Sequence, residues 1–151
     1  MTTKQWTQKG RSKGDGRFAR IMHFMMETPA WRSLPVYERA LYLELAKIYD
    51  GSNNGRIGLG CRRAAELCNM SVNKANACFQ TLVERGFIEV AAASGFNRKD
   101  RQATEWRLTQ YRCDRTGAIP SRAFQNWRPD QPKVANDETG EPRKAVARKA
   151  A

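Results

Sequence analysis

The chain has 151 residues, of which 27 are Lys or Arg and 15 are Asp or Glu, so its formal net charge at pH 7 is +12. This length fits one domain with flexible ends and excludes a protein with two sizeable enzyme domains. A sequence pI near 10.1 predicts an anionic partner, either nucleic acid or an acidic membrane surface. No apolar stretch approaches the ~20 residues of a spanning helix, and no secretory signal opens the chain, so we expect a cytoplasmic protein, which would be nucleoid-associated if its anionic partner is DNA.

The positive charge is distributed unevenly along the chain. Residues 1–17 have five basic residues and one acidic residue, residues 18–128 have 17 and ten, and residues 129–151 have five and four. Residues 1–17 are polar and Gly-rich, and residues 129–151 have almost no large apolar side chains, so neither segment can bury enough surface to become ordered. We therefore expect a flexible basic arm over 1–17, a folded domain over 18–128 and a disordered tail over 129–151. The nearly neutral tail gives little support to a membrane anchor.

The folded segment begins with an apolar run over residues 18–26, which fits either an extended segment or a helix. Thr28 followed by Pro29 predicts a helix start, with Thr as the N-cap and Pro at the first helical position. This helix is expected to end before Pro35, which opens the next helix. In that second helix four apolar residues recur at helical spacing and are expected to face inward: Tyr37, Leu41, Leu45 and Ile48.

A strong turn signal follows at residues 50–55, and residues 56–59 are long enough only for a short strand. Residues 61–68 predict a short helix that ends at Asn69, a residue that tolerates the left-handed conformation. Ser71 is a good N-cap for a helix that continues to about Arg85 and stops at Gly86. On that helix Val72, Ala75, Cys78, Phe79 and Leu82 are expected to pack inward, opposite Asn73, Lys74, Asn76, Ala77 and Gln80.

Residues 87–91 and 104–109 alternate between apolar and polar side chains, as strands do, and a basic loop joins them. The order of helix, short strand, helix, turn, helix and hairpin predicts a single α+β, helix-rich, winged helix-turn-helix domain in which the hairpin is the wing. Phe124 and Trp127 fit a final short helix packed on the core, with base stacking as the alternative. We expect Trp31 and Trp106 in the core, and Phe96 packed under the wing rather than inserted near DNA.

The second helix of the predicted helix-turn-helix has polar side chains suited to the major groove. The amides of Asn73, Asn76 and Gln80 can donate to and accept from adenine edges, and Lys74 can meet a guanine or a phosphate. Ser71 and the free backbone N–H groups near it suit a phosphate oxygen. Basic residues on both sides are expected to supply most of the affinity. Arg62 and Arg63 would contact the flanking DNA backbone, and the hairpin-tip residues would contact phosphates or the minor groove; these are Arg98, Lys99 and Arg101.

The sequence has no recognisable catalytic, metal-binding or cofactor-binding motif. Its four Cys include no Cys-x-x-Cys pair, and His23 lies far from all of them, so the ligand spacing of a zinc site is missing. We expect reduced thiols, with Cys68 and Cys78 in the core. Gly58 and Gly60 are not part of a phosphate-binding loop. The sequence therefore predicts a protein that is not an enzyme and has no cofactor, no metal and no small-molecule ligand.

Several short runs carry a resemblance to a known family. They are residues 28–31 (TPAW), 38–41 (ERAL), 50–55 (DGSNNG), 63–66 (RAAE), 84–88 (ERGFI) and 103–109 (ATEWRLT). Over residues 17–128 the chain resembles the small winged helix-turn-helix proteins of bacterial plasmids, prophages and mobile elements. It is similar, more distantly, to the N-terminal winged domains of plasmid replication initiators. The resemblance implies a recognition helix over 71–85, a wing over 90–104 and sequence-specific binding of double-stranded DNA.

These observations predict a transcriptional regulator of a bacterial plasmid, prophage or mobile element. A replication or conjugative-transfer accessory protein that binds DNA is the first alternative. A protein-binding winged-helix adaptor, such as a phage-encoded inhibitor, is the alternative from another class. We expect a homodimer on an inverted repeat because such domains usually gain specificity in that way, although no residue of the sequence demands it.

Overall fold

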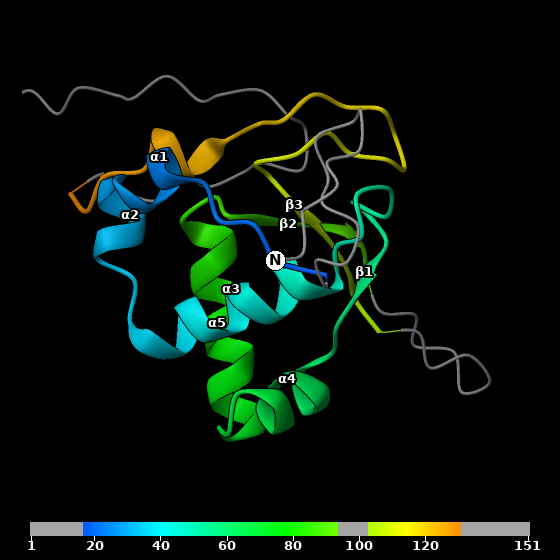
Figure 1. The fold of residues 1–151 in the computed structure, drawn as a ribbon. Coiled ribbons are helices and arrows are strands. Elements are labelled where there is room, and N and C mark those ends of the chain that lie inside the picture. Colours follow the sequence, from blue (N-terminus) through cyan, green and yellow to red (C-terminus); the bar gives the residue numbers. More distant parts are fainter. Residues whose placement is uncertain (1–16, 94–102, 131–151) are drawn as a thin grey trace, which may run out of the picture.

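The computed structural model describes residues 17–93 and 103–130 of the chain and has an α+β architecture (Figure 1). Within these residues the structure has five α-helices, one 3-10 helix and a small three-stranded antiparallel sheet. In chain order the elements are α1 (His23–Met26), α2 (Pro29–Arg32), α3 (Val36–Ile48), β1 (Ile57–Gly58), α4 (Cys61–Leu67), α5 (Val72–Glu84), β2 (Ile88–Ala92), β3 (Glu105–Leu108) and η1 (Ala123–Gln125).

The predicted helix starts are confirmed. The Thr28 side chain accepts a hydrogen bond from the Trp31 backbone N–H at 3.2 Å, and Pro29 is the first residue of α2. The Ser71 hydroxyl accepts from the backbone N–H of Lys74 at 3.2 Å and caps α5 in the same way. Each cap satisfies a backbone donor that the first turn of a helix leaves without a partner. The ambiguous run at 18–26 is extended first and then forms α1.

Two residues with positive φ end α4 and α5 as expected. Asn69 has a φ of 52°, in the left-handed region, and directs the chain from α4 to α5. Gly86 has a φ of +79°, and a Cβ at that position would lie 2.7 Å from atoms of Ala123 and Phe124. Gly86 is therefore required both for its backbone conformation and for the close approach of the segment that carries η1.

The sheet has the strand order β1-β3-β2, so the last strand lies between the other two. β2 and β3 form the predicted antiparallel hairpin, in which Val90 pairs with Trp106, and Trp106 also pairs with Ile57 of β1. The register shifts between Val90 and Ala92, near the end of β2. The loop that joins the two strands includes residues 94–102, so the expected position of Phe96 lies outside the described residues.

One hydrophobic core contains residues from Met25 to Phe124. At its centre, Phe87 makes edge contacts with the rings of Trp31 and Tyr42, at centroid distances of 5.7 and 5.8 Å, and stacks on Phe124 at 5.2 Å. Trp106 stacks on Phe79 with centroids 4.6 Å apart and donates its indole N–H to the carbonyl of Leu59. The expected core positions of Trp31, Trp106 and Phe124 are thus confirmed, and complete burial excludes Phe124 from base stacking.

Trp127 and Cys68 lie at the edge of this core. Trp127 is half-buried against it, and the Arg85 guanidinium carbon lies 4.6 Å from the centroid of the indole ring. Cys68 is also half-buried, whereas Cys78 is fully buried. The packing alternative for Trp127 is therefore confirmed, and of the two cysteines only Cys78 is a full member of the core.

The inward stripe expected on α3 is wrong at its first position. Tyr37 is 45 % exposed, whereas its neighbour Glu38 is 3 % exposed and faces α5. Leu41 and Leu45 are buried as expected, and Tyr42 is buried beside them. The apolar spacing missed Glu38 because a carboxylate is rarely buried without a cation, and its cation, Lys74, lies 36 residues later in the chain.

The turn over residues 50–55 is linked to the end of β3 through Asn54, which is fully buried. The Asn54 Oδ1 accepts from the Leu108 backbone N–H at 2.7 Å, and Nδ2 lies 2.9–3.2 Å from the carbonyl oxygens of Leu108, Tyr111 and Arg112. The Asn54 backbone N–H donates to the Asp114 carboxylate at 2.8 Å. One side chain thus joins segments more than 50 residues apart. No helix in the described part of the chain is both long and apolar enough to cross a membrane.

Candidate nucleic-acid interface

The helices α4 and α5 pack on each other and are joined by a short turn at residues 68–71. The Met70 backbone N–H donates to the carbonyl of Ala65 at 3.0 Å, which closes the turn. Ala65 is buried, as expected of a small residue where two helices cross, and Ala75 and Cys78 are buried on the inner side of α5. The close packing orients α5 so that its opposite side faces solvent.

The outer face of α5 presents a row of side-chain amides. Asn73, Asn76 and Gln80 are all exposed, and their spacing of three and four residues places them on one side of the helix. Within the described residues, the side chains of Asn73 and Gln80 make no hydrogen bond. These amides can each donate and accept, which is the pattern that an adenine edge requires. The predicted reading face is therefore exposed to solvent.

The amide row lies beside the start of α4 and the base of the hairpin. The Asn76 Oδ1 is 3.9 Å from the Cys61 Sγ at the first residue of α4. Just before it, a Cβ on Gly60 would lie 3.8 Å from the Cβ of Ala103, where the described part of the chain resumes before β3. The three elements that the sequence assigned to one surface are thus neighbours in the fold.

The two predicted basic residues of α4 differ in their contacts. Arg62 is exposed, and within the described ranges no hydrogen bond or ion pair involves its guanidinium group. Arg63 is also exposed, but its Nη1 lies 2.9 Å from the Glu66 carboxylate one turn later. Arg62 is thus available to an anionic partner, whereas Arg63 would have to exchange a partner that it already has.

The Lys74 ammonium points toward α3 rather than along the amide row. Its Nζ is 3.5 Å from the Glu38 Oε1 and 5.6 Å from the centroid of the Tyr37 ring, and the Lys74 side chain is 40 % exposed. The other carboxylate oxygen of Glu38 is buried and has no hydrogen-bond partner among the residues that the structure describes. Burial, together with the Glu38 charge, raises the pKa of the nearby Cys78 thiol to about 11. Lys74 therefore balances a buried charge between α3 and α5.

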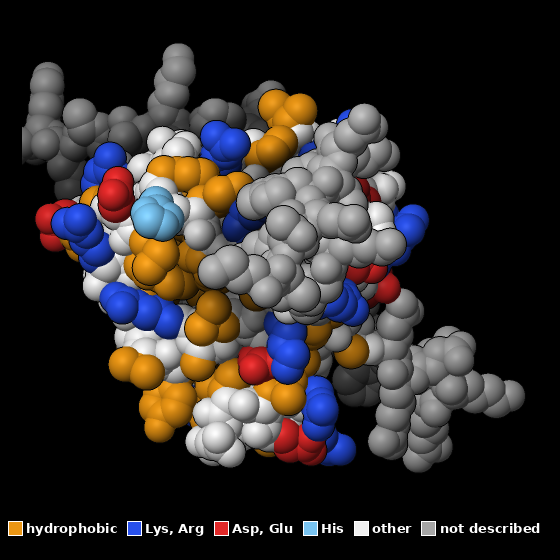
Figure 2. Space-filling view, viewed as in Figure 1, with side chains coloured by type: hydrophobic (Ala, Val, Ile, Leu, Met, Phe, Trp, Pro, Cys, Tyr) orange, Lys and Arg blue, Asp and Glu red, His pale blue; other side chains and the backbone are white. Residues whose placement is uncertain are grey.

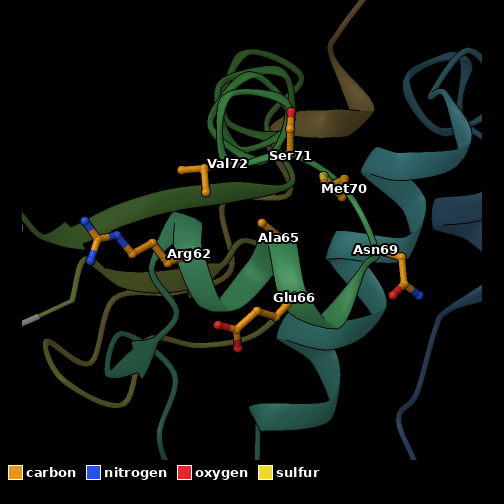
Figure 3. Close-up of a pocket in the computed structure, with 7 residues that line it drawn as sticks. All are labelled: Arg62, Ala65, Glu66, Asn69, Met70, Ser71 and Val72. Atoms are coloured by element: carbon orange, nitrogen blue, oxygen red, sulfur yellow. The ribbon is translucent and has the colours of Figure 1, made fainter.

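Val72 is an exposed residue beside the amide row whose exposure the sequence pattern missed. It was expected to pack inward, but its side chain is 47 % exposed. It lines an open groove of about 580 Å³ beside the α4–α5 turn (Figure 3). The other lining residues are Arg62, Ala65, Glu66, Asn69, Met70 and Ser71. The position of Val72 in the helix could have predicted its exposure. It directly follows the N-cap, so no preceding helical turn covers it.

Three of the predicted contact residues, Arg98, Lys99 and Arg101, lie outside the described residues, so their position relative to α5 stays a prediction. Two basic residues that the sequence did not single out, Arg107 and Arg115, form ion pairs with Glu89 and Glu105 at 3.1 and 2.6 Å. These pairs tie the hairpin to itself and to the segment after β3. In residues 17–93 and 103–130, no group of three or more His, Cys, Asp or Glu side chains could hold a metal ion.

Comparison with protein-family models, with curated proteins and with solved structures gives no match to this chain.

Proposed function

We propose that this chain is a sequence-specific double-stranded DNA-binding protein with a winged helix-turn-helix fold. In this proposal α4 and α5 are the helix-turn-helix, α5 is the recognition helix, and the β2–β3 hairpin is the wing. The element order and the strand order β1-β3-β2 support this interpretation, because they join the helix pair to a hairpin beside it. The biological role we propose is transcriptional regulation in a bacterial plasmid, prophage or mobile element.

The outer face of α5 is the observation that carries the proposal. One side of this 13-residue helix is buried through Ala75, Phe79 and Leu82, while the other has exposed amides at Asn73, Asn76 and Gln80. A helix with one polar, solvent-facing side fits the major groove of B-form DNA. Amide groups discriminate between base edges without adding charge, so this face would supply selectivity rather than affinity.

Affinity in this proposal comes from cations around α5. Arg62 is exposed beside the reading face, and Arg98, Lys99 and Arg101 lie in the loop of the proposed wing. The net charge of +12 acts over a longer range and raises the local concentration of duplex. Lys74 is assigned a supporting role, since its ammonium lies against Glu38.

Selection of bound duplexes from a random library, followed by binding titrations at several salt concentrations, tests the proposal. We expect one enriched motif and an affinity that falls steeply as salt rises, because several phosphate contacts release counterions. Arg98→Ala with Arg101→Ala should weaken binding to every duplex alike, whereas Asn76→Ala should relax discrimination at one base position. Gln125→Ala removes an exposed amide on η1, far along the chain from α5, and is the matched control.

The outcomes separate the two parts of this proposal. Undetectable binding, or binding that does not change with salt, would contradict DNA binding altogether. Equal effects of the wing variant and of Asn76→Ala on every sequence would contradict only the division between affinity and reading. The symmetry of the selected motif also decides whether a homodimer binds an inverted repeat. A motif found at replication or transfer origins would favour the accessory role over regulation.

A second candidate, a protein-binding adaptor, is favoured by exposed apolar side chains on another surface. Figure 2 shows hydrophobic side chains over the face formed by α1 and α3, interspersed with Lys and Arg. Val36 and Leu43 of α3 are 79 % and 47 % exposed, and Ile119 is 80 % exposed. Such side chains can mark a protein interface. If Val36→Ser with Leu43→Ser abolished binding of a protein partner and left DNA binding unchanged, this candidate would be supported.

A further inference from the structure

Val72 combines an apolar side chain with a position on the solvent-facing part of the helix pair. It opens α5 and is 47 % exposed, whereas Ala75 and Phe79, the next apolar residues on its side of the helix, are 0 % and 3 % exposed. Exposed helix positions favour straight-chain residues or Ala over the β-branched Val. Helix stability therefore does not account for Val at this position.

The groove beside Val72 is lined by both apolar and polar side chains, and one of the polar ones is a cation. Arg62 lines the same groove and has no ion pair within the described part of the chain. Figure 3 shows Val72 and Arg62 projecting toward the same side of that groove, from α5 and α4 respectively. Asn76 lies one helical turn after Val72, so their side chains are neighbours on the surface of α5. The apolar side chain of Val72 thus shares its groove with a cation and is followed one turn later by an amide.

Ser71, the other residue at the start of α5, is less able to read a base. Its hydroxyl oxygen accepts the backbone N–H of Lys74 at 3.2 Å and is occupied by capping the helix. Val72 is therefore an apolar side chain at this end of α5 that is exposed and that neither caps the helix nor packs in the core of the described residues. In the major groove, the apolar feature that distinguishes one base of unmodified DNA from the others is the C5-methyl group of thymine.

We propose that Val72 is a specificity-determining residue that packs against a thymine C5-methyl group, next to a phosphate held by Arg62. This inference rests on the proposed function, since it assumes that α5 lies in the major groove. The positive guanidinium holds the DNA backbone, and the exposed methyl groups of Val72 exclude water from the thymine methyl. The contact adds base discrimination that the amide row cannot supply, because amides read hydrogen-bonding edges only.

Replacement of thymine by deoxyuridine tests the contact directly, because deoxyuridine lacks only the C5-methyl group. Each thymine of the selected duplex is replaced in turn, and the dissociation constant is measured for the full chain and for Val72→Ala. We expect one replacement to weaken binding of the unaltered protein about four-fold, the value for burial of one methyl group. Val72→Ala should bind the original duplex with a similar loss and should no longer respond to that replacement.

Two further variants control for structural effects. Val83→Ala changes a Val of similar exposure, 40 %, in the last turn of α5 and should keep the full response to deoxyuridine. Val72→Thr keeps the side-chain shape and one methyl group, so it should retain part of the response to deoxyuridine that Val72→Ala loses. The urea unfolding midpoint of each variant shows that it is folded.

Each outcome bears on a specific part of the inference. A selected duplex that tolerates deoxyuridine at every position, or that has no thymine, would overturn the role of Val72 while leaving DNA binding intact. A Val72→Ala variant that still responded to deoxyuridine would overturn that role as well. Failure to select any duplex would instead contradict the proposed function.

Discussion

The turn around Asn54 and the outer face of α5 both present side-chain amides, but these amides have opposite environments. Asn54 is fully buried, and its amide contacts backbone groups of Leu108, Tyr111 and Arg112 at 2.7–3.2 Å. On α5, Asn73 and Gln80 are exposed, and their side chains make no hydrogen bond within residues 17–93 and 103–130. The first amide holds two distant segments together, and the others are available to a partner.

This difference indicates that the buried amide contributes to stability, whereas the exposed amides are free to serve the proposed binding. A buried amide is costly to remove because its partners lose their hydrogen bonds and remain out of contact with water. An exposed amide exchanges its hydrogen bonds with water freely, so its removal leaves the free energy of unfolding almost unchanged. Substitutions can therefore test the two regions separately.

Asn54→Ala should destabilise the fold most, because it leaves one backbone N–H and several carbonyl groups without a hydrogen-bond partner. We expect the free energy of unfolding to fall by about 3–5 kcal/mol, measured by urea denaturation. Asn73→Ala, the exposed counterpart, should change it by less than about 0.5 kcal/mol. Similar losses of unfolding free energy in both variants would show that the buried and the exposed amide do not differ in their contribution to stability.

Lys74→Met should cause the next largest fall in the free energy of unfolding. It tests whether one side chain of α5 stabilises the fold while the amides of the same helix do not. Lys74 belongs to the same helix as the amides, but its ammonium lies 3.5 Å from the buried Glu38 carboxylate. Removal of the ammonium leaves that carboxylate without its cation, so we expect a loss of about 1–3 kcal/mol in the free energy of unfolding. Glu38→Gln in the same chain should restore part of this loss, and an unchanged stability of Lys74→Met would contradict the assignment.

The inner side of α5 should also differ from its outer side in its response to pH. The pKa of Cys78 is raised from 9.0 to about 11, chiefly by burial, so folding favours the protonated thiol. The resulting stability is complete below about pH 9 and is lost as the pH rises toward 11. The stability difference between the unaltered protein and Cys78→Ala should therefore shrink by about 1–2 kcal/mol over this range in urea titrations. A pH-independent difference would be inconsistent with a buried thiol.

The smallest predicted effect is on DNA affinity, and it differs between the neighbouring residues Arg62 and Arg63. Arg62→Ala should weaken DNA binding by about 1 kcal/mol and reduce the slope of log affinity against log salt by about 1. Arg63→Ala should have a smaller effect, because Arg63 already pairs with Glu66 at 2.9 Å. Titrations of both variants on the selected duplex provide the measurement. Equal losses would indicate that DNA displaces the Glu66 contact at little cost.

The sequence alone determined most element boundaries, because the groups that start and stop a helix lie within a few residues of one another. Thr28 and Ser71 cap the helices that follow them, and Asn69 and Gly86 have the positive φ expected where α4 and α5 end. The exposure of the amide row on α5 was predictable for a similar reason. Its opposite face is apolar at helical spacing, and such a face becomes buried in a domain of this size.

Only the tertiary structure decided which charged and apolar side chains are available at the surface. Glu38 and Lys74 meet across 36 residues, and Asn54 contacts backbone groups more than 50 residues away, so no local pattern connects them. Val72 matches the apolar spacing of α5 but is 47 % exposed, whereas Ala75 in the same turn is fully buried, so the spacing alone did not decide which of the two is covered. Local hydrogen bonds and periodicity define elements, whereas burial depends on which elements pack together, and packing is a property of the whole chain.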